Sequence, residues 1–222
     1  MTDTRVTPLV PSPGHFIDLA GWKRREHFEL FRGYAKPFFS VCAELDATVL
    51  RESCSAPDGP LFSLATIFLA LRCANETESF RMRVRGDGVW VHDRVSIGPT
   101  ILRTDETFGF ARLDPAENLG DFMRLNASEL ARARKVGPLS GMHPDDDMIY
   151  QSTLPWIRFT GFSNAMAGNG DSIPRVVFGK CSKDGARWRL PVGLEVHHAV
   201  VDGIDAGRYL ERLELSMGSN VA

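Results

Sequence analysis

Val196-His197-His198-Ala199-Val200-Val201-Asp202-Gly203 is the stretch of this sequence that indicates both a fold and a chemistry. Residues 187–197 have the composition of a strand, and residues 203–215 have the pattern of a helix. Adjacent residues on a strand point to opposite faces, so only one of the two histidines faces a given site. Gly203 permits a sharp bend between the two elements. An imidazole at such a junction can take a proton from a hydroxyl or thiol near neutral pH.

Taken alone, the histidine pair leaves three interpretations open. The first is that both are ordinary surface or core residues, as most histidine pairs are. The second is metal binding, which is disfavoured because it needs further ligands and because adjacent strand side chains diverge too much to hold one zinc ion; no metal is expected. The third is catalysis, which the complete HHxxxDG pattern between a strand and a helix favours.

The rest of the chain mixes strand-like and helix-like segments without strict β-α-β alternation, which favours an α+β domain with a mixed sheet. Gly86-Asp87-Gly88 is a strong hairpin signal, and 136–147 is the clearest loop. Strands are expected at 39–46, 80–85, 89–91, 95–103, 108–113, 156–162, 176–179 and 187–197. Helices are expected at 19–31, capped by Asp18, shortly after Asp46 or Thr48, at 61–74, at 118–135 and at 203–215. With no linker or repeat in between, residues 1–222 are expected to form a single domain.

Composition narrows the class of protein. The 222 residues are 43% hydrophobic and 24% charged with a formal charge of −2, which is ordinary for a globular protein and argues against a nucleic-acid-binding one. No apolar run reaches the roughly 18 residues of a membrane span, so no membrane association is expected. The four cysteines form no CxxC pair, which favours reduced thiols and a cytoplasmic location.

Four blocks of sequence resemble the chloramphenicol acetyltransferase family. They are HHAVVDGIDAGRYLERL at 197–213, WKRREHFELF at 22–31, FRMRVRGDGVWVHD at 80–93 and STLPWIRFTGF at 152–162, in the same order and over nearly the full chain. HHxxxDG alone also occurs in dihydrolipoyl acyltransferases, plant acyltransferases and peptide-synthetase condensation domains. The flanking blocks and the length favour the antibiotic-acetylating branch. The resemblance implies a CoA-dependent acyltransferase fold, a two-layer mixed β-sheet domain with helices packed on it.

The resemblance also implies a mechanism. His198 would be the general base that removes a proton from the 3-hydroxyl of chloramphenicol, which then attacks acetyl-CoA, the acetyl donor, in a ternary complex. Ser152 would stabilise the oxyanion. Asp202 invites a triad interpretation, but the resemblance pairs it instead with Arg24, as a structural pair that holds the active-site turn together with Gly203.

The partners and the acceptor pocket are also implied by the resemblance. The family is trimeric, with each active site between two subunits. Phe31, Phe39 and Phe162 match or neighbour acceptor-pocket positions. Val177 stands where the family has a pocket threonine, and Arg175 stands at an aliphatic pocket position, where a cation suits a polar or anionic acceptor unless it turns outward.

These departures, and an acidic loop shorter than the family's aromatic-rich segment, leave two alternatives open beside acetylation of chloramphenicol. One is acetyl transfer to another hydroxyl or amine. The other is a non-catalytic protein that sequesters a ligand. An intact set of Arg24, Ser152, His198 and Asp202 argues against the second, because a pure binder needs no base facing a thioester.

Overall fold

A mixed sheet organises the chain in the computed structural model, which describes residues 13–139, 145–166 and 171–219. Its strand order is β2-β10-β8-β7-β5-β6, with β9 paired to β10. The β5–β7 and β7–β8 pairs are parallel and the other pairs antiparallel, which confirms the expected α+β class. The strands are β2 (Phe38–Asp46), β5 (Ser96–Leu102), β6 (Phe108–Phe110), β7 (Met148–Thr153), β8 (Arg175–Phe178), β9 (Ser182–Asp184) and β10 (Arg187–His197).

A second, three-stranded sheet has the order β1-β4-β3. It contains β1 (Gly14–Phe16), β3 (Met82–Arg85) and β4 (Gly88–His92), and a short 3-10 helix, η1 (Glu78–Arg81), precedes it. The predicted hairpin is confirmed, because β3 and β4 pair through a turn in which Gly86 has a φ of 58°. A side chain is strained at that angle, so the turn depends on this glycine.

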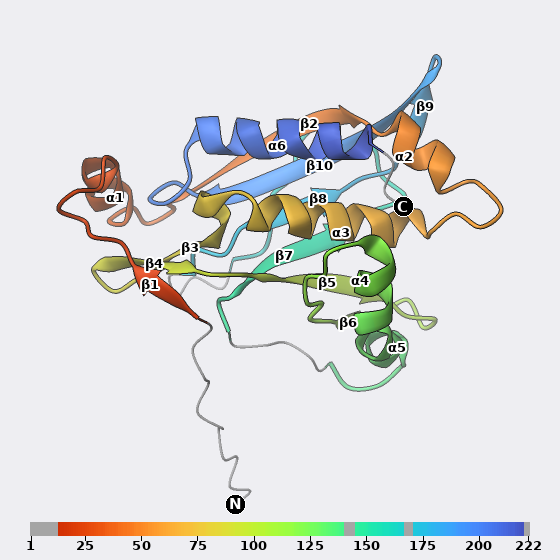
Figure 1. Ribbon diagram of the computed structural model, residues 1–222, viewed down its shortest axis with the longest axis horizontal. Helices are drawn as coiled ribbons and strands as arrows, with labels where there is room; N and C mark the ends of the chain where they lie inside the picture. Colours follow the sequence, from red (N-terminus) through yellow and green to blue (C-terminus); the bar gives the residue numbers. More distant parts are fainter. Residues whose placement is uncertain (1–12, 140–144, 167–170, 220–222) are drawn as a thin grey trace, which may run out of the picture.

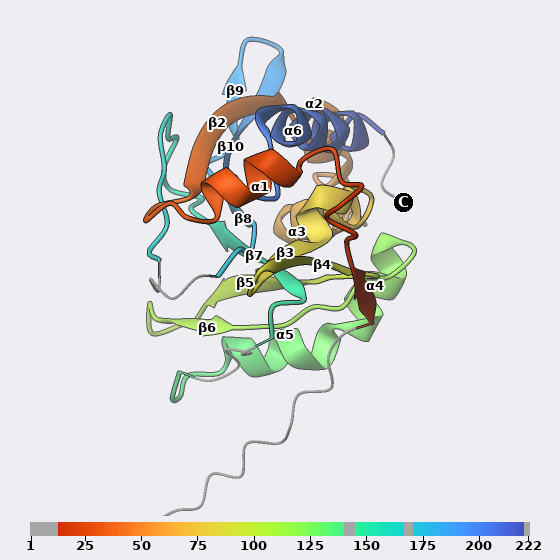
Figure 2. The ribbon, with the colours of Figure 1, turned by 90° about the vertical axis from the view of Figure 1, so that its left-hand side faces the viewer.

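Helices cover one face of the large sheet. The helices α3 (Phe62–Asn75) and α6 (Gly203–Met217) pack against each other along that face, as Figure 1 shows. Leu194 and Val196 of β10 belong to the core beneath them. Figure 2 shows α4 (Leu119–Leu125) and α5 (Ala127–Arg134) at the β5–β6 edge, and the remaining helices are α1 (Arg25–Phe31) and α2 (Thr48–Ser53).

The opposite face of the sheet is covered by a segment that was expected to be a strand. Residues 156–162 are not a strand: β7, which was missed, enters the sheet just before them. Pro155 has no N–H to donate to a ladder, and the chain leaves the sheet there. Phe159 and Phe162 then pack over Gly193, where a Cβ would lie 3.4 Å from each of them.

Two expected helices are shorter in the structure, and at each break a polar side chain binds backbone groups outside the helix. At the N-terminal one, Asp18 does not cap a helix: its Oδ1 accepts the Ala20 N–H at 3.0 Å, and the helix begins only at Arg25. The expected helix at 118–135 is two helices, because the side chain of Asn126 accepts the Asp114 N–H and donates to the Asp114 carbonyl. The expected buried helix at 61–74 is confirmed as α3.

Candidate active site

The turn after β10 fixes the backbone of His198. The carbonyl of His197 accepts the N–H groups of Val200 and Val201 at 3.1 and 3.0 Å, which closes the turn. The N–H of His198 donates to the carbonyl of Pro37 at 2.8 Å, just before β2. The end of β10 is therefore tied both to itself and to the start of the neighbouring strand.

Two phenylalanines hold the imidazole ring of His198. Phe31, the last residue of α1, stacks on it at 3.9 Å between ring centroids and 5° between planes. Phe39 lies 4.7 Å from the ring, tilted by 51°. The His198 side chain keeps 32% of its surface exposed, so the ring is held in place and still open to a substrate.

The nitrogen Nδ1 of His198 faces Asp202. Asp202 Oδ1 lies 3.3 Å from it, within ion-pair distance, while Nδ1 has no aligned hydrogen bond to any described group. Because Nδ1 is buried and faces a carboxylate, Nε2 is the nitrogen left for a substrate.

Arg24, on the chain just before α1, reaches the same turn. Its Nη1 lies 2.5 Å from Asp202 Oδ2, the pairing that the sequence led us to expect, and its Nη2 donates to the His198 carbonyl at 3.2 Å. Nη1 also lies 3.2 Å from Asp205 Oδ2. Asp205 was missed in the sequence analysis, although a carboxylate three residues after a helix-capping aspartate is a recognisable capping-box pattern. Arg24 therefore joins three parts of the turn.

His197 points away from the site and into the protein. It is 4% exposed, and its Nδ1 accepts the Ala199 N–H at 3.2 Å. Burial lowers the pKa of His197 from 6.5 to about 4, so the ring is neutral at ordinary pH. The two histidines thus have separate environments, as alternation along a strand requires.

Gly203 does not have the bending role that the sequence suggested. It is the first residue of α6, its φ is not in the left-handed region, and a Cβ added there would meet no atom within 4 Å. The bend is made before it, by the turn at 198–201 and by Asp202, whose backbone is extended. We find no need for glycine at this position within one copy of the chain.

Ser152, Val177 and Phe162 form a second group, away from the helices. Ser152 on β7 pairs with Val177 on β8, and Val177 pairs with Gly193 on β10, so all three share a sheet face. Phe162 packs on Gly193 from that same face. Ser152 Oγ accepts a hydrogen bond from Thr100 Oγ1 at 3.3 Å.

This second group lies far from His198 within one copy. His198 follows Gly193 by five residues, which places it about 16 Å from Gly193 along the strand direction. Ser152 is level with Gly193 but two strands away, which places it about 10 Å from Gly193 across the sheet. We call Arg24, Phe31, Phe39, His198 and Asp202 the histidine half of the site. We call Ser152, Phe162 and Val177 the serine half. A single copy does not bring the two halves together.

Arg175 is buried, and its charge is already matched. The residue is 5% exposed, and its Nη2 donates to Asp171 Oδ2 at 2.6 Å while Nη1 donates to the Ile173 carbonyl. Its guanidinium also lies over the rings of Phe38 and Tyr150. The side chain therefore turns inward, but as a paired group rather than as a free cation for an anionic acceptor.

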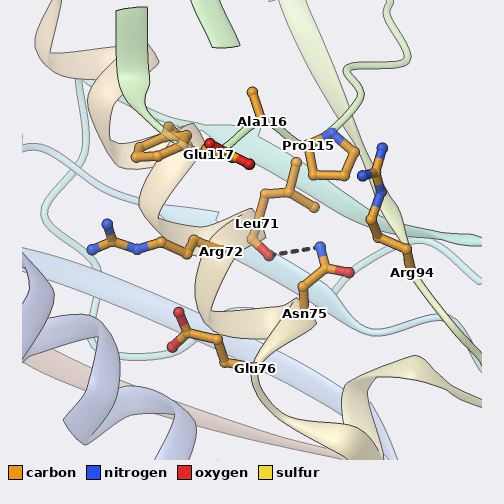
Figure 3. Close-up of a pocket in the computed structure, with 9 residues that line it drawn as sticks. Leu71, Arg72, Asn75, Glu76, Arg94, Pro115, Ala116 and Glu117 are labelled. Atoms are coloured by element: carbon orange, nitrogen blue, oxygen red, sulfur yellow. Dashed lines mark hydrogen bonds between the residues drawn. The ribbon is translucent and has the colours of Figure 1, made fainter. Parts of the chain in front are cut away.

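The described residues enclose two cavities large enough for a small molecule. One of about 700 Å³ opens beside His197 and includes Phe38, Asn164, Asp171 and Glu195 in its lining. The other, of about 460 Å³, lies between α3 and residues 115–117 (Figure 3). There the Asn75 side chain lines the cavity, but its amide group already donates to the carbonyls of Leu71 and Val95.

The described residues contain neither a membrane-spanning helix nor a metal-binding cluster. No helix among them is both long and apolar enough to span a bilayer. No group of three or more histidine, cysteine, aspartate or glutamate side chains within the described ranges is arranged to hold a metal ion.

Comparison with known proteins gives a consistent result. The family model of chloramphenicol acetyltransferase matches residues 15–214. The chain is 35% identical to chloramphenicol acetyltransferase 2 of Escherichia coli, over 90% of this chain and 94% of that protein. It is 32% identical to chloramphenicol acetyltransferase 2 of Haemophilus influenzae, with the same coverage. A solved chloramphenicol acetyltransferase structure shares the fold, with a TM-score of 0.80, 24% identity, and coverage of 92% of this chain and 100% of that one.

The mixed sheet and the histidine turn at the end of β10, together with these matches, define an enzyme of the CoA-dependent acetyltransferase class. More closely, the chain belongs to the chloramphenicol acetyltransferase family.

Proposed function

We propose that this protein transfers the acetyl group of acetyl-CoA to the 3-hydroxyl of chloramphenicol. The observation that carries the proposal is the setting of His198, stacked on Phe31 with Phe39 tilted beside it and with Nδ1 toward Asp202, which leaves Nε2 for a substrate. This is the arrangement that a general base needs, because the ring is fixed and one nitrogen is available. We take chloramphenicol as the acceptor because the relatives are chloramphenicol acetyltransferases.

The proton and the acetyl group move in a balanced sequence with both substrates bound. His198 Nε2 takes the hydroxyl proton as the oxygen bonds to the thioester carbonyl carbon. The tetrahedral intermediate then loses its carbon–sulfur bond, and the CoA thiolate takes the proton back from the imidazolium. Asp202 Oδ1, 3.3 Å from Nδ1, is the carboxylate oxygen that faces the ring while it holds the proton.

We propose further that the active site is completed by a second copy of the chain, in a homotrimer. Ser152 would donate its hydroxyl to the oxyanion, and the sheet register puts it about 19 Å from His198 within one copy. Such a separation supports an active site in which the serine half of one copy faces the histidine half of another. A particle of about three times 24.6 kDa in light scattering would support it, and a monomer at working concentration would contradict it.

The direct test is thiol release from acetyl-CoA on addition of chloramphenicol, with the product identified by mass. Release that depends on the drug, with one acetyl group added to it, supports the proposal. The control without acceptor measures simple thioester hydrolysis. Release with another acceptor and none with chloramphenicol would overturn the choice of substrate while keeping the chemistry.

A second acceptor is therefore the main alternative within the same class. It is favoured by Val177, which is 1% exposed and apolar where the family has a pocket threonine, and by the buried Arg175–Asp171 pair. A panel of hydroxyl and amine compounds in the same assay separates the two. Binding of a ligand with no thiol release in any arm would instead support a sequestering protein.

A further inference from the structure

Asp205 occupies the first turn of α6 and contacts the histidine half through two neighbours. Its Oδ2 accepts the Asp202 N–H at 3.0 Å, and the two residues form a capping box at the helix start. The same oxygen lies 3.2 Å from Arg24 Nη1. One carboxylate oxygen thus ties the backbone that precedes α6 to the guanidinium that reaches it from the other side of the turn.

The contacts of Arg24 show what this tie fixes. Nη1 is shared between Asp202 Oδ2 and Asp205 Oδ2, while Nη2 holds the carbonyl of His198. Asp202 is therefore held by its backbone N–H and by one oxygen, which leaves Oδ1 as the oxygen that faces His198 Nδ1 at 3.3 Å. Without Asp205, Arg24 would have one carboxylate partner in place of two, and the Asp202 N–H would lose the oxygen that accepts it.

The net charge of Arg24, Asp202 and Asp205 also supports an effect of Asp205 on His198. Arg24 and Asp202 alone would be a neutral pair, whereas Asp205 makes the cluster of three carry a net charge of −1. The Asp202 and Asp205 side chains are only 27% and 22% exposed, so solvent screens this charge incompletely. The surplus negative charge lies on the Nδ1 side of His198, where it attracts an N–H on Nδ1 and so helps to orient the ring.

We infer that Asp205 is a positioning residue for proton transfer at His198, acting through Arg24 and Asp202. The inference deepens the proposed function and rests on it. Asp205 does not touch the reacting atoms. Its action is to hold the Asp202 carboxylate toward Nδ1 and to leave the Arg24 cluster one negative charge in excess.

The test compares Asp205→Asn with Asp205→Ala. Asparagine keeps an oxygen that accepts the Asp202 N–H, so the helix cap survives while the charge is lost; alanine removes both. Glu211→Gln, at an exposed position further along α6, is the matched control for the loss of one carboxylate. We expect Asp205→Asn to lower kcat about five- to tenfold with KM for acetyl-CoA changed less than about twofold, and Glu211→Gln to change neither.

A nitrogen-15 spectrum of the His198 ring, assigned with His198→Ala, gives a readout that does not depend on activity. The wild-type protein and Glu211→Gln are expected to show the proton on Nδ1, and Asp205→Asn to show a shift toward Nε2. If Asp205→Asn keeps the wild-type kcat and ring signals, and Asp205→Ala only lowers Tm, Asp205 is a helix cap alone and the inference is wrong. If His198→Ala stays active, the proposed mechanism fails, while the spectrum still decides whether Asp205 acts on the His198 ring.

Discussion

The histidine half and the serine half of the site are built in different ways. The first is assembled over one turn by an ion pair, backbone hydrogen bonds and ring stacking, all within a short reach of His198. The second is three side chains from β7, β8 and the segment after β7, aligned only by strand register and packing. The proton acceptor is thus positioned by residues close to His198, whereas the position of the serine half depends on the register of the whole sheet. As we propose, it depends also on a second copy of the chain.

Removal of the base is the sharpest way to break the histidine half. His198→Ala is expected to lower kcat by about 10²- to 10⁴-fold, because no other described imidazole faces the site. The side chain is partly exposed, so the fold should survive, which circular dichroism checks. His27→Ala, at an exposed position on α1, is the control and should keep full thiol release. Undiminished turnover in purified His198→Ala would end the proposed mechanism.

Ser152→Ala tests the serine half. Loss of one oxyanion donor is expected to lower kcat by about 10²- to 10³-fold with little change in KM. Steady-state kinetics at several concentrations of each substrate measure both constants. An effect on KM alone would mean that Ser152 binds substrate and does not stabilise the intermediate.

Mixing the two inactive variants then tests whether the halves come from different copies. If Ser152→Ala and His198→Ala chains are unfolded together and refolded, random pairing should restore about a quarter of the sites. Each variant refolded alone is the control. Failure to recover any activity, in a mixture shown to contain mixed oligomers, would place both halves in one copy.

The lowered pKa of His197 predicts that the protein loses stability in acid. Its folded-state pKa of about 4 is below its ordinary value of 6.5, so the unfolded chain binds the proton first as pH falls. Its neutral, buried form therefore costs no stability above pH 6.5, and stability is lost progressively between pH 6.5 and 4, by up to about 2 kcal/mol at pH 5. Urea unfolding at pH 7 and pH 5 measures this loss.

His197→Asn isolates that effect. Asparagine can still accept the Ala199 N–H but does not titrate, so the difference in unfolding free energy between pH 7 and pH 5 should shrink. The overall stability falls as well, since the side chain is smaller, and only the pH-dependent difference bears on the prediction. An unchanged difference would assign the acid sensitivity to other groups.

Val177→Thr is the substitution for which we expect the smallest effect on activity. It places a hydroxyl on the serine half at the position that the resemblance aligns with a pocket threonine of the family, and one added hydrogen bond is worth about two- to tenfold in rate. We expect kcat/KM for chloramphenicol to rise within that range if chloramphenicol is a substrate of this site. Val177→Ala, which adds no hydroxyl, is the control. A fall in kcat/KM with Thr as large as with Ala would mean that the acceptor needs the apolar surface.

Much of the fold was predictable because it depends on local periodicity. The buried helix α3, the β3–β4 hairpin and β10 all follow from apolar spacing and turn glycines. The predictions that were wrong have different causes: a contact made far away in sequence, a single polar side chain, or a proline. Asn126 divides a helix by binding Asp114, and Pro155 ends β7 where a strand was expected to follow.

For the site, the sequence by itself determined which residues carry the chemistry to be tested, because HHxxxDG and its flanking blocks are specific in both type and order. It also determined that the two histidines face apart, since strand geometry leaves no alternative. Only the tertiary structure decided that Asp205 shares Arg24, that Arg175 is neutralised by Asp171, that Gly203 is not needed for the bend, and that Ser152 lies far from His198. These are matters of side-chain direction and strand register, which arise when segments distant in sequence pack together.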